Sequence, residues 1–483
     1  MNRSFYNGIA GIKTHQFGID TWANNIANQN AFGFKENLPE FETQFSQALN
    51  CTSIGNDIGL GSNAQGTSLD LSQGELVDSD RNFDTAIAGN GWYGFKSKDS
   101  VHYTKLGAFY KDSDGNLVNA NGEYLLGSLN NTLKPANLSQ EQLNSFGKLY
   151  SQEGINNVNI FTIDPLQDTP LSDINAQDKI NLPDILYIPP TPTTTLKFGA
   201  NLNIEVDSQI DPQTNREVAK SFDHFTTALF NPDGSQNILD MTFTKQFPQT
   251  QEGATYNADF KILKNIGEKQ TGINYDPAQY LTYPNDNTLY QIVDAQAGTL
   301  RFNGTGALVE SNLPVLSNEG IAITLNLGTA LDNNIPNSGY DGITAIKGLG
   351  RETKFVQNNG KKEGILNDYV IQEDGNIVAN FTNGQSASVA KIAIFHFPNE
   401  GGLEKINNTM FIQSSNSGKA FFYQKDGQNI NGGKILTNKL EDSNVQLSTA
   451  LTELIIMQKA FDANAKSITT SDQMIQKAIN MKR

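Results

Sequence analysis

The N-terminal end of the chain carries apolar side chains at the spacing of a helix that packs against other helices. Phe5, Ile9, Ile12, Ile19 and Ile26, with Gln16 and Ala23 between them, follow one another in alternating steps of four and three. That spacing forms a heptad seam, one narrow stripe along a helix. Asn28-Gln29-Asn30 and Gly33 then match the residues at which helices usually end.

The C-terminal end repeats this pattern over a greater length. The seam consists of Leu447, Leu451, Leu454, Gln458, Phe461, Ala465, Ile468, Asp472, Ile475 and Ile479. Its steps again alternate between four and three, which predicts a long helix with one apolar stripe. Ser443 and Gln446 have the spacing of a capping box, so we expect this helix to begin there.

Between the two ends, the sequence predicts short strands joined by tight turns. Asp-Gly or Asn-Gly pairs recur at residues 114–115, 121–122, 233–234, 374–375 and 383–384. Segments rich in β-forming residues flank them, for example 239–244 and 392–397, which is typical of hairpins. The prolines at positions 189, 190 and 192 indicate a domain boundary or a crossing strand. We therefore predict a mainly β protein with helical ends.

Size and charge narrow the function classes. With 483 residues, the chain is long enough for two to four domains of about 100–200 residues each. The net charge is −16, of which residues 1–35 carry +2, residues 440–483 carry 0 and the middle carries −18. This balance opposes binding to nucleic acid or to an anionic membrane. Near-neutral ends can pack together, whereas the acidic middle favours solubility.

The sequence shows no recognisable targeting segment and has a single cysteine. We find neither a cleavable secretory signal nor an apolar run that could span a membrane, so we expect no membrane insertion. The protein is expected to be cytoplasmic or to leave the cell by a route that reads no cleaved signal. The single cysteine, Cys51, excludes an intramolecular disulfide and is interpreted as an incidental loop thiol.

Two motifs resemble ligand sites but fit turns better. Residues 89–94 match the dinucleotide pattern G-x-G-x-x-G, yet the segment that follows predicts a strand hairpin where that site needs a helix. Asp112-x-Asp114-Gly115 hints at a calcium loop, but its glycine stands at the wrong position. The four histidines are scattered. We expect no catalytic, cofactor-binding or metal-ligating residue and no cofactor, although a pair of carboxylates stays open.

The terminal seams carry the main functional signal. One alternative is an ordinary pair of core helices inside a single globular domain. However, chain ends usually fray unless they are docked, and a narrow heptad stripe suits helical partners. Two helices cannot bury both stripes fully, so we predict a coiled-coil-like arm that neighbouring copies of the chain complete.

Both ends also resemble a known family. Residues 23–35 resemble the N-terminal signature of flagellar rod and hook proteins, although that family usually has threonine where this chain has Ala31. Residues 442–448 and 458–466 are similar to its C-terminal signature. Residues 89–95, 103–107 and 117–127 look like the first β domain of the family, and 374–399 look like its returning half. The block after Ile188 looks like the entry to the outer domain of hook members, beyond which residues 204–345 have no match.

The resemblance implies nested, discontinuous domains. Terminal helices (1–30 and 440–483) would form the assembly domain, followed by a connecting segment (31–69). A first β domain (70–187 and 350–435) and an outer β domain (188–349) would complete the chain. The assembly interface is predicted at Phe5, Ile9, Ile12, Ile19, Ile26, Leu447, Leu451, Leu454, Phe461, Ile468 and Ile475. The signature residues are Asn24, Asn25, Asn28, Gly33, Phe34 and Lys35, of which the three asparagines are expected to cap the helix end and bond to backbone.

The resemblance further implies a structural subunit of the bacterial flagellum, exported by the flagellar type III apparatus. The subunit would polymerise with itself into the bent, hollow hook that passes torque from rod to filament, outside the cell. Rod, hook cap and hook–filament junction proteins would be its other partners. A straight distal rod subunit of the basal body is the nearest alternative. An unrelated enzyme or adhesin with a β body is the other.

Overall fold

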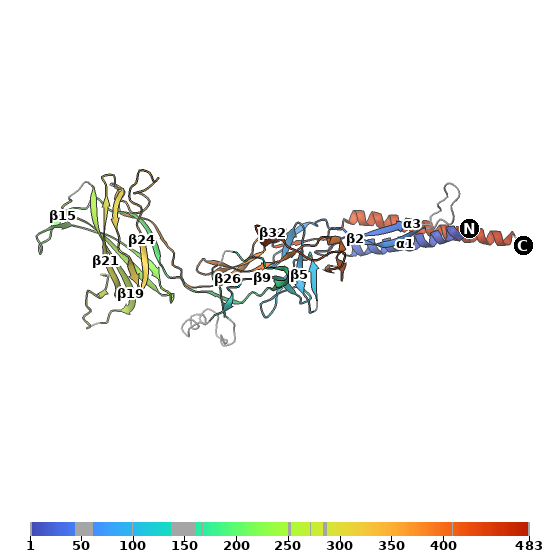
Figure 1. Ribbon diagram of the computed structural model, residues 1–483, viewed down its shortest axis with the longest axis horizontal. Coiled ribbons are helices and arrows are strands. Elements are labelled where there is room, and N and C mark those ends of the chain that lie inside the picture. The colour runs from blue at the N-terminus through green and yellow to red at the C-terminus, as the bar shows by residue number, and fades with distance from the viewer. Residues whose placement is uncertain are drawn as a thin grey trace. The chain divides into compact units, whose positions relative to one another are not determined.

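The computed structural model describes residues 2–43, 61–98, 100–136, 160–165, 168–249, 253–270, 272–283, 287–407 and 409–481. Apart from 3-10 turns, the helices in these ranges are α1 (Asn2–Ala27) and α3 (Leu447–Asn480), at the two ends of the chain. The remaining regular structure is β-strand (Figure 1). The prediction of a mainly β protein with terminal helices is therefore confirmed. Cys51 lies outside the described residues.

The chain divides into two compact units. Unit 1 comprises residues 1–186, 366–380 and 386–483, and unit 2 comprises residues 187–365 and 381–385. The chain thus leaves unit 1 just before the proline cluster and returns to it at Leu366. The finer division into four domains that the sequence suggests stays a prediction.

Unit 1 contains two helices and many short strands, of which β13, β26 and β27 extend into unit 2. The strands are β1 (Asn37–Thr43), β2 (Ser62–Leu69), β3 (Leu76–Asp78), β4 (Thr85–Ala88), β5 (Trp92–Lys96), β6 (Val101–Thr104), β7 (Tyr110–Lys111), β8 (Leu117–Val118), β9 (Tyr124–Leu129), β10 (Lys134–Pro135), β11 (Ile160–Thr162), β12 (Asp178–Lys179), β13 (Ile185–Ile188), β26 (Gly364–Ile371), β27 (Asn376–Phe381), β28 (Ser386–Ile392), β29 (Ile394–Phe395), β30 (Glu404–Lys405), β31 (Met410–Ile412), β32 (Tyr423–Lys425), β33 (Gln428–Ile430), β34 (Lys434–Thr437) and β35 (Lys439–Glu441).

The largest sheet of unit 1 interleaves early and late parts of the chain. Its central order is β27-β28-β9-β5-β6-β31-β30, so strands from before and after unit 2 lie side by side. An aromatic cluster packs against it, in which Trp92 meets Phe411 edge to face at 5.0 Å and Tyr103 meets Phe397 at 4.8 Å. Such pairs stabilise a core beyond the area they bury. The sheet therefore forms only when both halves of the chain are present.

The predicted turns form as hairpins. Residues 114–115 join β7 to β8, and residues 121–122 join β8 to β9. In the first turn, the carboxylate of Asp112 accepts bonds from the backbone N–H groups of Asp114 and Asn116, which uses it as a turn cap and not as a calcium ligand. The glycine-rich segment at 89–94 leads into β5, which pairs antiparallel with β6. The predicted strand hairpin is confirmed at this position.

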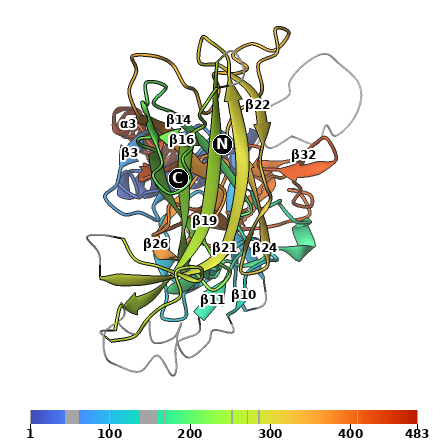
Figure 2. The same ribbon diagram turned by 90° about the vertical axis from the view of Figure 1, so that its left-hand side faces the viewer.

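Unit 2 consists of longer strands in two principal sheets. The strands are β14 (Thr195–Asn201), β15 (Ser208–Ile210), β16 (Glu217–Ala219), β17 (Asp223–Phe230), β18 (Gln236–Lys245), β19 (Ala254–Glu268), β20 (Tyr280–Leu281), β21 (Thr288–Phe302), β22 (Leu308–Asn312), β23 (Leu316–Asn318), β24 (Ile321–Asn326) and β25 (Glu352–Asn358). One sheet has the order β17-β18-β19-β21-β20 with β22 on β21, and the other has the order β23-β24-β14-β25. Figure 2 shows the long, curved β19 and β21 side by side.

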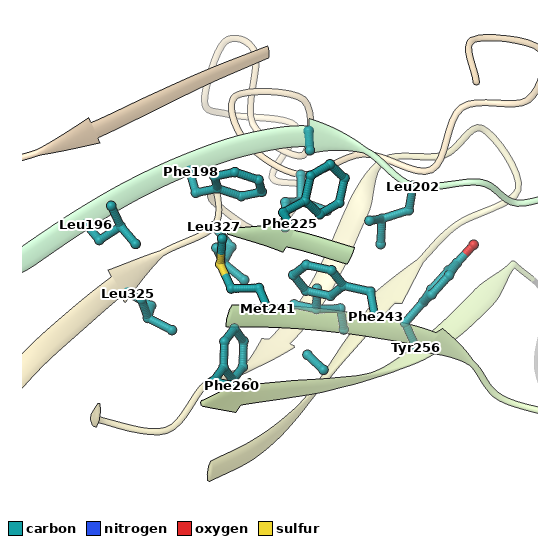
Figure 3. Close-up of a cluster of buried hydrophobic side chains, with 14 of the residues drawn as sticks. Leu196, Phe198, Leu202, Phe225, Met241, Phe243, Tyr256, Phe260, Leu325 and Leu327 are labelled. Atoms are coloured by element: carbon teal, nitrogen blue, oxygen red, sulfur yellow. The ribbon is translucent and has the colours of Figure 1, made fainter. Parts of the chain in front are cut away.

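The core of unit 2 lies between these sheets. Phe198 of β14 and Phe225 of β17 meet edge to face at 5.3 Å, and Phe243 makes edge-to-face contacts with both Phe225 and Phe260 (Figure 3). Phe198, Phe243 and Phe260 are almost fully buried. Alternate positions along β18 and β19 point into this core, as the two-residue period of a strand requires. Unit 2 thus has an aromatic core of its own, while other apolar side chains such as Phe222 and Val315 stay exposed.

The predicted start of the C-terminal helix is wrong. α3 begins at Leu447, and Gln446 precedes it without a side-chain cap bond in the described structure. Ser443, the expected cap, accepts a bond from the backbone N–H of Val445 instead. The preceding residues are held in β35, which pairs with β3. These tertiary contacts keep residues 439–444 extended, so the local capping signal has no helix to cap.

Candidate assembly interface

α1 and α3 run antiparallel and touch through a face of α1 that is lined by small residues (Figure 1). Gly8 lies against Ile468, Gly11 against Asn464 and Gly18 against Met457. A Cβ atom on Gly8 or Gly11 would stand 2.7 Å from the facing side chain. The hydroxyls of Ser4 and Ser471 lie 3.2 Å apart at the far end of the pair. The helices therefore approach more closely than larger side chains would permit.

Sequence reasoning missed this glycine face. Hydrophobic periodicity is read from apolar side chains, and glycine has no side chain to contribute to the pattern. A signal was nevertheless present, because Gly11 and Gly18 are seven residues apart and Gly8 is three residues before Gly11. Small residues at that spacing allow close backbone approach between helices. The seam predicted for α1 lies beside this face.

The five predicted interface residues of α1 are only partly covered in the single chain. Phe5, Ile9, Ile12, Ile19 and Ile26 are all half-buried.

Some of the cover over α1 comes from the hairpin of β1 and β2, which packs on the helix as well. In that contact, the hydroxyl of Thr14 donates to the carbonyl of Ser62 at 3.0 Å. α1 is therefore held by both α3 and the hairpin, yet its apolar stripe is not sealed.

α3 leaves more of its predicted seam open. Leu447 and Leu451 are 43% and 42% exposed, whereas Leu454, Phe461, Ile468 and Ile475 are half-buried. Ile479, the last residue of the seam, is exposed too, and so are Ile455, Ile456 and Met474 outside it. An open groove of about 500 Å³ runs beside Ser4 and Met474. Exposed apolar surface of this kind marks a place where another molecule binds.

The three signature asparagines lie at the end of α1. The side chain of Asn25 is fully buried, where it donates to the carbonyl of Asn37 and accepts from the N–H of the same residue. Asn28 donates to the carbonyl and the side-chain oxygen of Asn24. Asn25 thus fixes the start of β1 against the helix.

The other signature residues join the two ends of the chain through a buried ion pair. The ammonium of Lys35 lies 2.6 Å from a carboxylate oxygen of Glu441, and both side chains are at most 2% exposed. Lys35 also donates to the carbonyl of Ser72, and Glu441 accepts from the N–H of Gly74. The N–H of Gly33 donates to the carbonyl of Glu441. Each charge is therefore paired and hydrogen-bonded, as burial demands.

Asn444 reinforces this junction. Its side-chain oxygen accepts from the N–H of Glu36, and its nitrogen donates to the carbonyls of Asp70 and Ser72.

Gly33 has φ +71°, and a Cβ atom there would stand 2.8 Å from the backbone of Leu106. We call the contact of residues 33–36, 70–75 and 441–444 the terminal junction. It brings together segments from opposite ends of the sequence.

Further buried charges lie near the terminal junction. The pKa of Lys105 is lowered to about 8, chiefly by burial; the charge of Lys35 contributes to this shift, whereas Glu400 and Glu441 oppose it. Burial also lowers the pKa of His396 to about 4, with Lys105 adding to the effect. Neither ring nitrogen of His396 has a hydrogen-bond partner within the described part of the chain. His396 is therefore neutral at pH 7.

Two further features concern metal binding and membrane insertion. The described residues contain no group of three or more His, Cys, Asp or Glu side chains placed to hold a metal ion. None of the helices in the described ranges is long and apolar enough to cross a bilayer.

Comparisons with known proteins point to one family. Residues 437–481 match the model of the flagellar basal body rod FlgEFG protein C-terminal region, and residues 86–165 match that of the flagellar hook protein FlgE/F/G D1 domain. The chain is 28% identical to the flagellar hook protein FlgE of Borreliella burgdorferi over 100% of both chains. It is 26% identical to the protein of that name from Escherichia coli, over 99% of this chain and 100% of the other. The crystal structure of Helicobacter pylori flagellar hook protein FlgE2 has a TM-score of 0.46 at 15% identity, covering 76% of this chain and 100% of that one.

Proposed function

We propose that this chain, which is homologous along its whole length to flagellar hook proteins, is the structural subunit of a bacterial flagellar hook. The observation that carries the proposal is the full-length similarity, because it extends through unit 2 as well as through both ends. A straight rod subunit is less favoured, since the full-length relatives are named as hook proteins.

Self-assembly fits the exposed surface of the helices. Leu447, Leu451 and Ile455 repeat every four residues along α3 and are all more than 40% exposed. Burial of such side chains is favourable by about 25 cal/mol per Å² of apolar area. Neighbouring copies that cover this stripe and the half-buried seam of α1 would gain that energy. The terminal helices therefore form the inner contacts of the polymer.

The acidic, polar body suits the outer contacts. A hook bends as it rotates, so contacts far from its axis must change while contacts near the axis persist. The charge of −18 between residues 36 and 439 keeps these outer parts soluble and weakly associating. Strong inner burial and weak outer contacts together permit a bent tube that still transmits torque.

The expected partners follow from this role. The subunit would contact other copies of itself along the tube, with rod, hook cap and hook–filament junction proteins at its ends. Export would proceed through the flagellar type III apparatus and place the protein outside the cell. Its role is structural and not enzymatic.

Removal of either helix tests the proposal. We expect chains that lack residues 1–25 or 450–483 to stay soluble, with unit 2 and the sheet of unit 1 folded, because their aromatic clusters lie outside the deleted segments. Such chains should form no tubes. Electron microscopy of polymers, together with circular dichroism of the soluble chains, measures both outcomes.

Deletion of the gene from the chromosome distinguishes a hook subunit from a rod subunit. Cells without the gene should complete the rod and stop before the hook, and the full-length gene should restore curved tubes. Cells that stop within the rod, or that assemble straight tubes, would show that the chain is a rod subunit. Loss of all folded structure on truncation would favour a single globular domain instead.

A further inference from the structure

The contacts between α1 and α3 follow one strict antiparallel alignment. Ser4 faces Ser471, Gly11 faces Asn464 and Gly18 faces Met457, so every advance of seven residues on α1 is matched by a retreat of seven on α3. Seven residues are two helical turns, which is the heptad period of both seams. The contact therefore repeats itself along the helix pair.

A repeating contact does not specify its own register. The residues of α3 that face Gly18, Gly11 and Ser4 are Met457, Asn464 and Ser471, and the same heptad spacing continues to Ala450 and Ala478. A slip by one heptad would place Ser471 opposite Gly11, Asn464 opposite Gly18 and Ala478 opposite Ser4. Ser471, Asn464 and Ala478 are no larger than Asn464 and Met457, the residues that Gly11 and Gly18 face in the native register. The helices alone thus distinguish the two registers poorly.

The terminal junction follows the last contacts of the helix pair along both segments. Lys35 lies 17 positions after Gly18, and Glu441 lies 16 positions before Met457. The ion pair therefore ties together the two segments that leave the same end of the helix pair. Both charges also lie close to the helices, since α1 ends at Ala27 and α3 begins at Leu447.

A buried ion pair discriminates between registers far more sharply than an apolar contact. A slip at the terminal junction would leave the ammonium of Lys35 without Glu441 in a site that water does not reach, and an uncompensated buried charge is strongly unfavourable. Single polar pairs in otherwise apolar helix contacts fix register in this way. Glu441 is further tied to Gly74, whose Cβ position is blocked by the carbonyl of Asp442, so the strand cannot shift locally.

We propose that the Lys35–Glu441 ion pair sets the register of the terminal helix pair, as a positioning device outside the helices. The pair acts by alignment and not by adding stability, since replacing both charges by apolar residues of similar size can leave stability unchanged. The inference goes beyond the proposed function, because it concerns register within one chain.

Cysteine crosslinking in the full-length chain tests this proposal. In a Cys51→Ser background, Ser4→Cys with Ser471→Cys reports the native register, and Ser4→Cys with Ala478→Cys reports the slipped one. A slip of seven residues moves a helix by about 10 Å, and disulfides need Cα atoms within about 7 Å. With Lys35 and Glu441 intact, only the native pair should crosslink, as measured by mass spectrometry of non-reduced peptides.

The junction variants then separate register from folding. In Lys35→Met/Glu441→Leu, we expect the slipped crosslink to appear beside the native one, because the backbone bond from Gly33 to Glu441 and the bonds of Asn444 remain. With Trp22→Phe added, the fluorescence of Trp92 shows that the sheet of unit 1 is folded. Glu441→Gln, which keeps the side-chain oxygen that Lys35 and Gly74 contact, should give an intermediate ratio. Crosslinking at the native pair alone in both variants, or at neither pair, would overturn the proposal. The crosslinks are read whether or not tubes form, so failure of the hook assignment is a separate result.

Discussion

The core of unit 2 and the contact between α1 and α3 are packed by opposite kinds of residue. In unit 2, large aromatic side chains such as Phe243 and Phe260 meet edge to face and are shielded from water. In the helix pair, glycines make the contact, and large apolar side chains such as Leu451 and Ile479 remain outside it. The unit 2 core is closed within the chain, whereas the apolar stripe of α3 stays open to solvent.

This difference has a thermodynamic reason. Isolated helices are marginally stable in water, and most helical stability in proteins comes from packing of an apolar face. A two-helix contact through glycines brings backbones together but removes little apolar area from water. A sandwich of two sheets closes over its core completely. The β units therefore carry most of the packing that folding needs, whereas the apolar surface of the helices stays available for the contacts between copies proposed above.

The largest effect is expected for truncation inside the unit 2 core. Phe243→Ala should lower the free energy of unfolding of unit 2 by about 3–5 kcal/mol, because it removes transfer energy and leaves a cavity. Thermal unfolding followed by circular dichroism measures this loss. Both tryptophans, Trp22 and Trp92, lie in unit 1, so their fluorescence serves as the internal control. A fluorescence transition that shifts equally would contradict independent folding of the units.

A smaller effect is expected from acid on the sheet of unit 1. The pKa of His396 is lowered to about 4, below the usual 6.5, so the unfolded state binds more protons between those values. The free energy of unfolding should therefore fall by up to about 3 kcal/mol as pH decreases from 6.5 to 4. Denaturant titrations of a Trp22→Phe chain, followed through Trp92, measure this dependence.

His396→Phe provides the matched control for the pH experiment. Phenylalanine keeps a ring near Tyr423, whose centroid lies 4.6 Å from that of His396, but it does not titrate. Its unfolding free energy should vary less between pH 4 and 6.5. An unchanged pH dependence in this variant would assign the effect to other groups.

The smallest effect on the single chain is expected on the exposed stripe of α3. Leu451→Ser should change the free energy of unfolding by less than about 0.5 kcal/mol, because the side chain is 42% exposed. The same change should raise the protein concentration needed for tube formation, which light scattering and electron microscopy measure. Thr452→Ser, at the next exposed position, is the control. Equal polymerisation by both variants would place Leu451 outside the interface.

Local signals in the sequence set the kinds of element and their order. Heptad spacing predicted both terminal helices, and pairs such as Asn121-Gly122 predicted the hairpins, because these signals act between residues close in the chain. The capping box at Ser443, by contrast, predicted the wrong start for the C-terminal helix. It is a local signal, and pairing of β35 with β3 outweighs it.

Contacts between distant segments alone decide which face of α1 meets α3 and which charges meet in the interior. Glycines carry no hydrophobic signal, so close packing at Gly8 and Gly11 emerges only when two helices are placed together. Lys35 and Glu441 are 406 positions apart, and neither residue alone indicates a partner among the many charges of the chain. Local periodicity fixes a helix, whereas burial and register depend on groups that folding brings together.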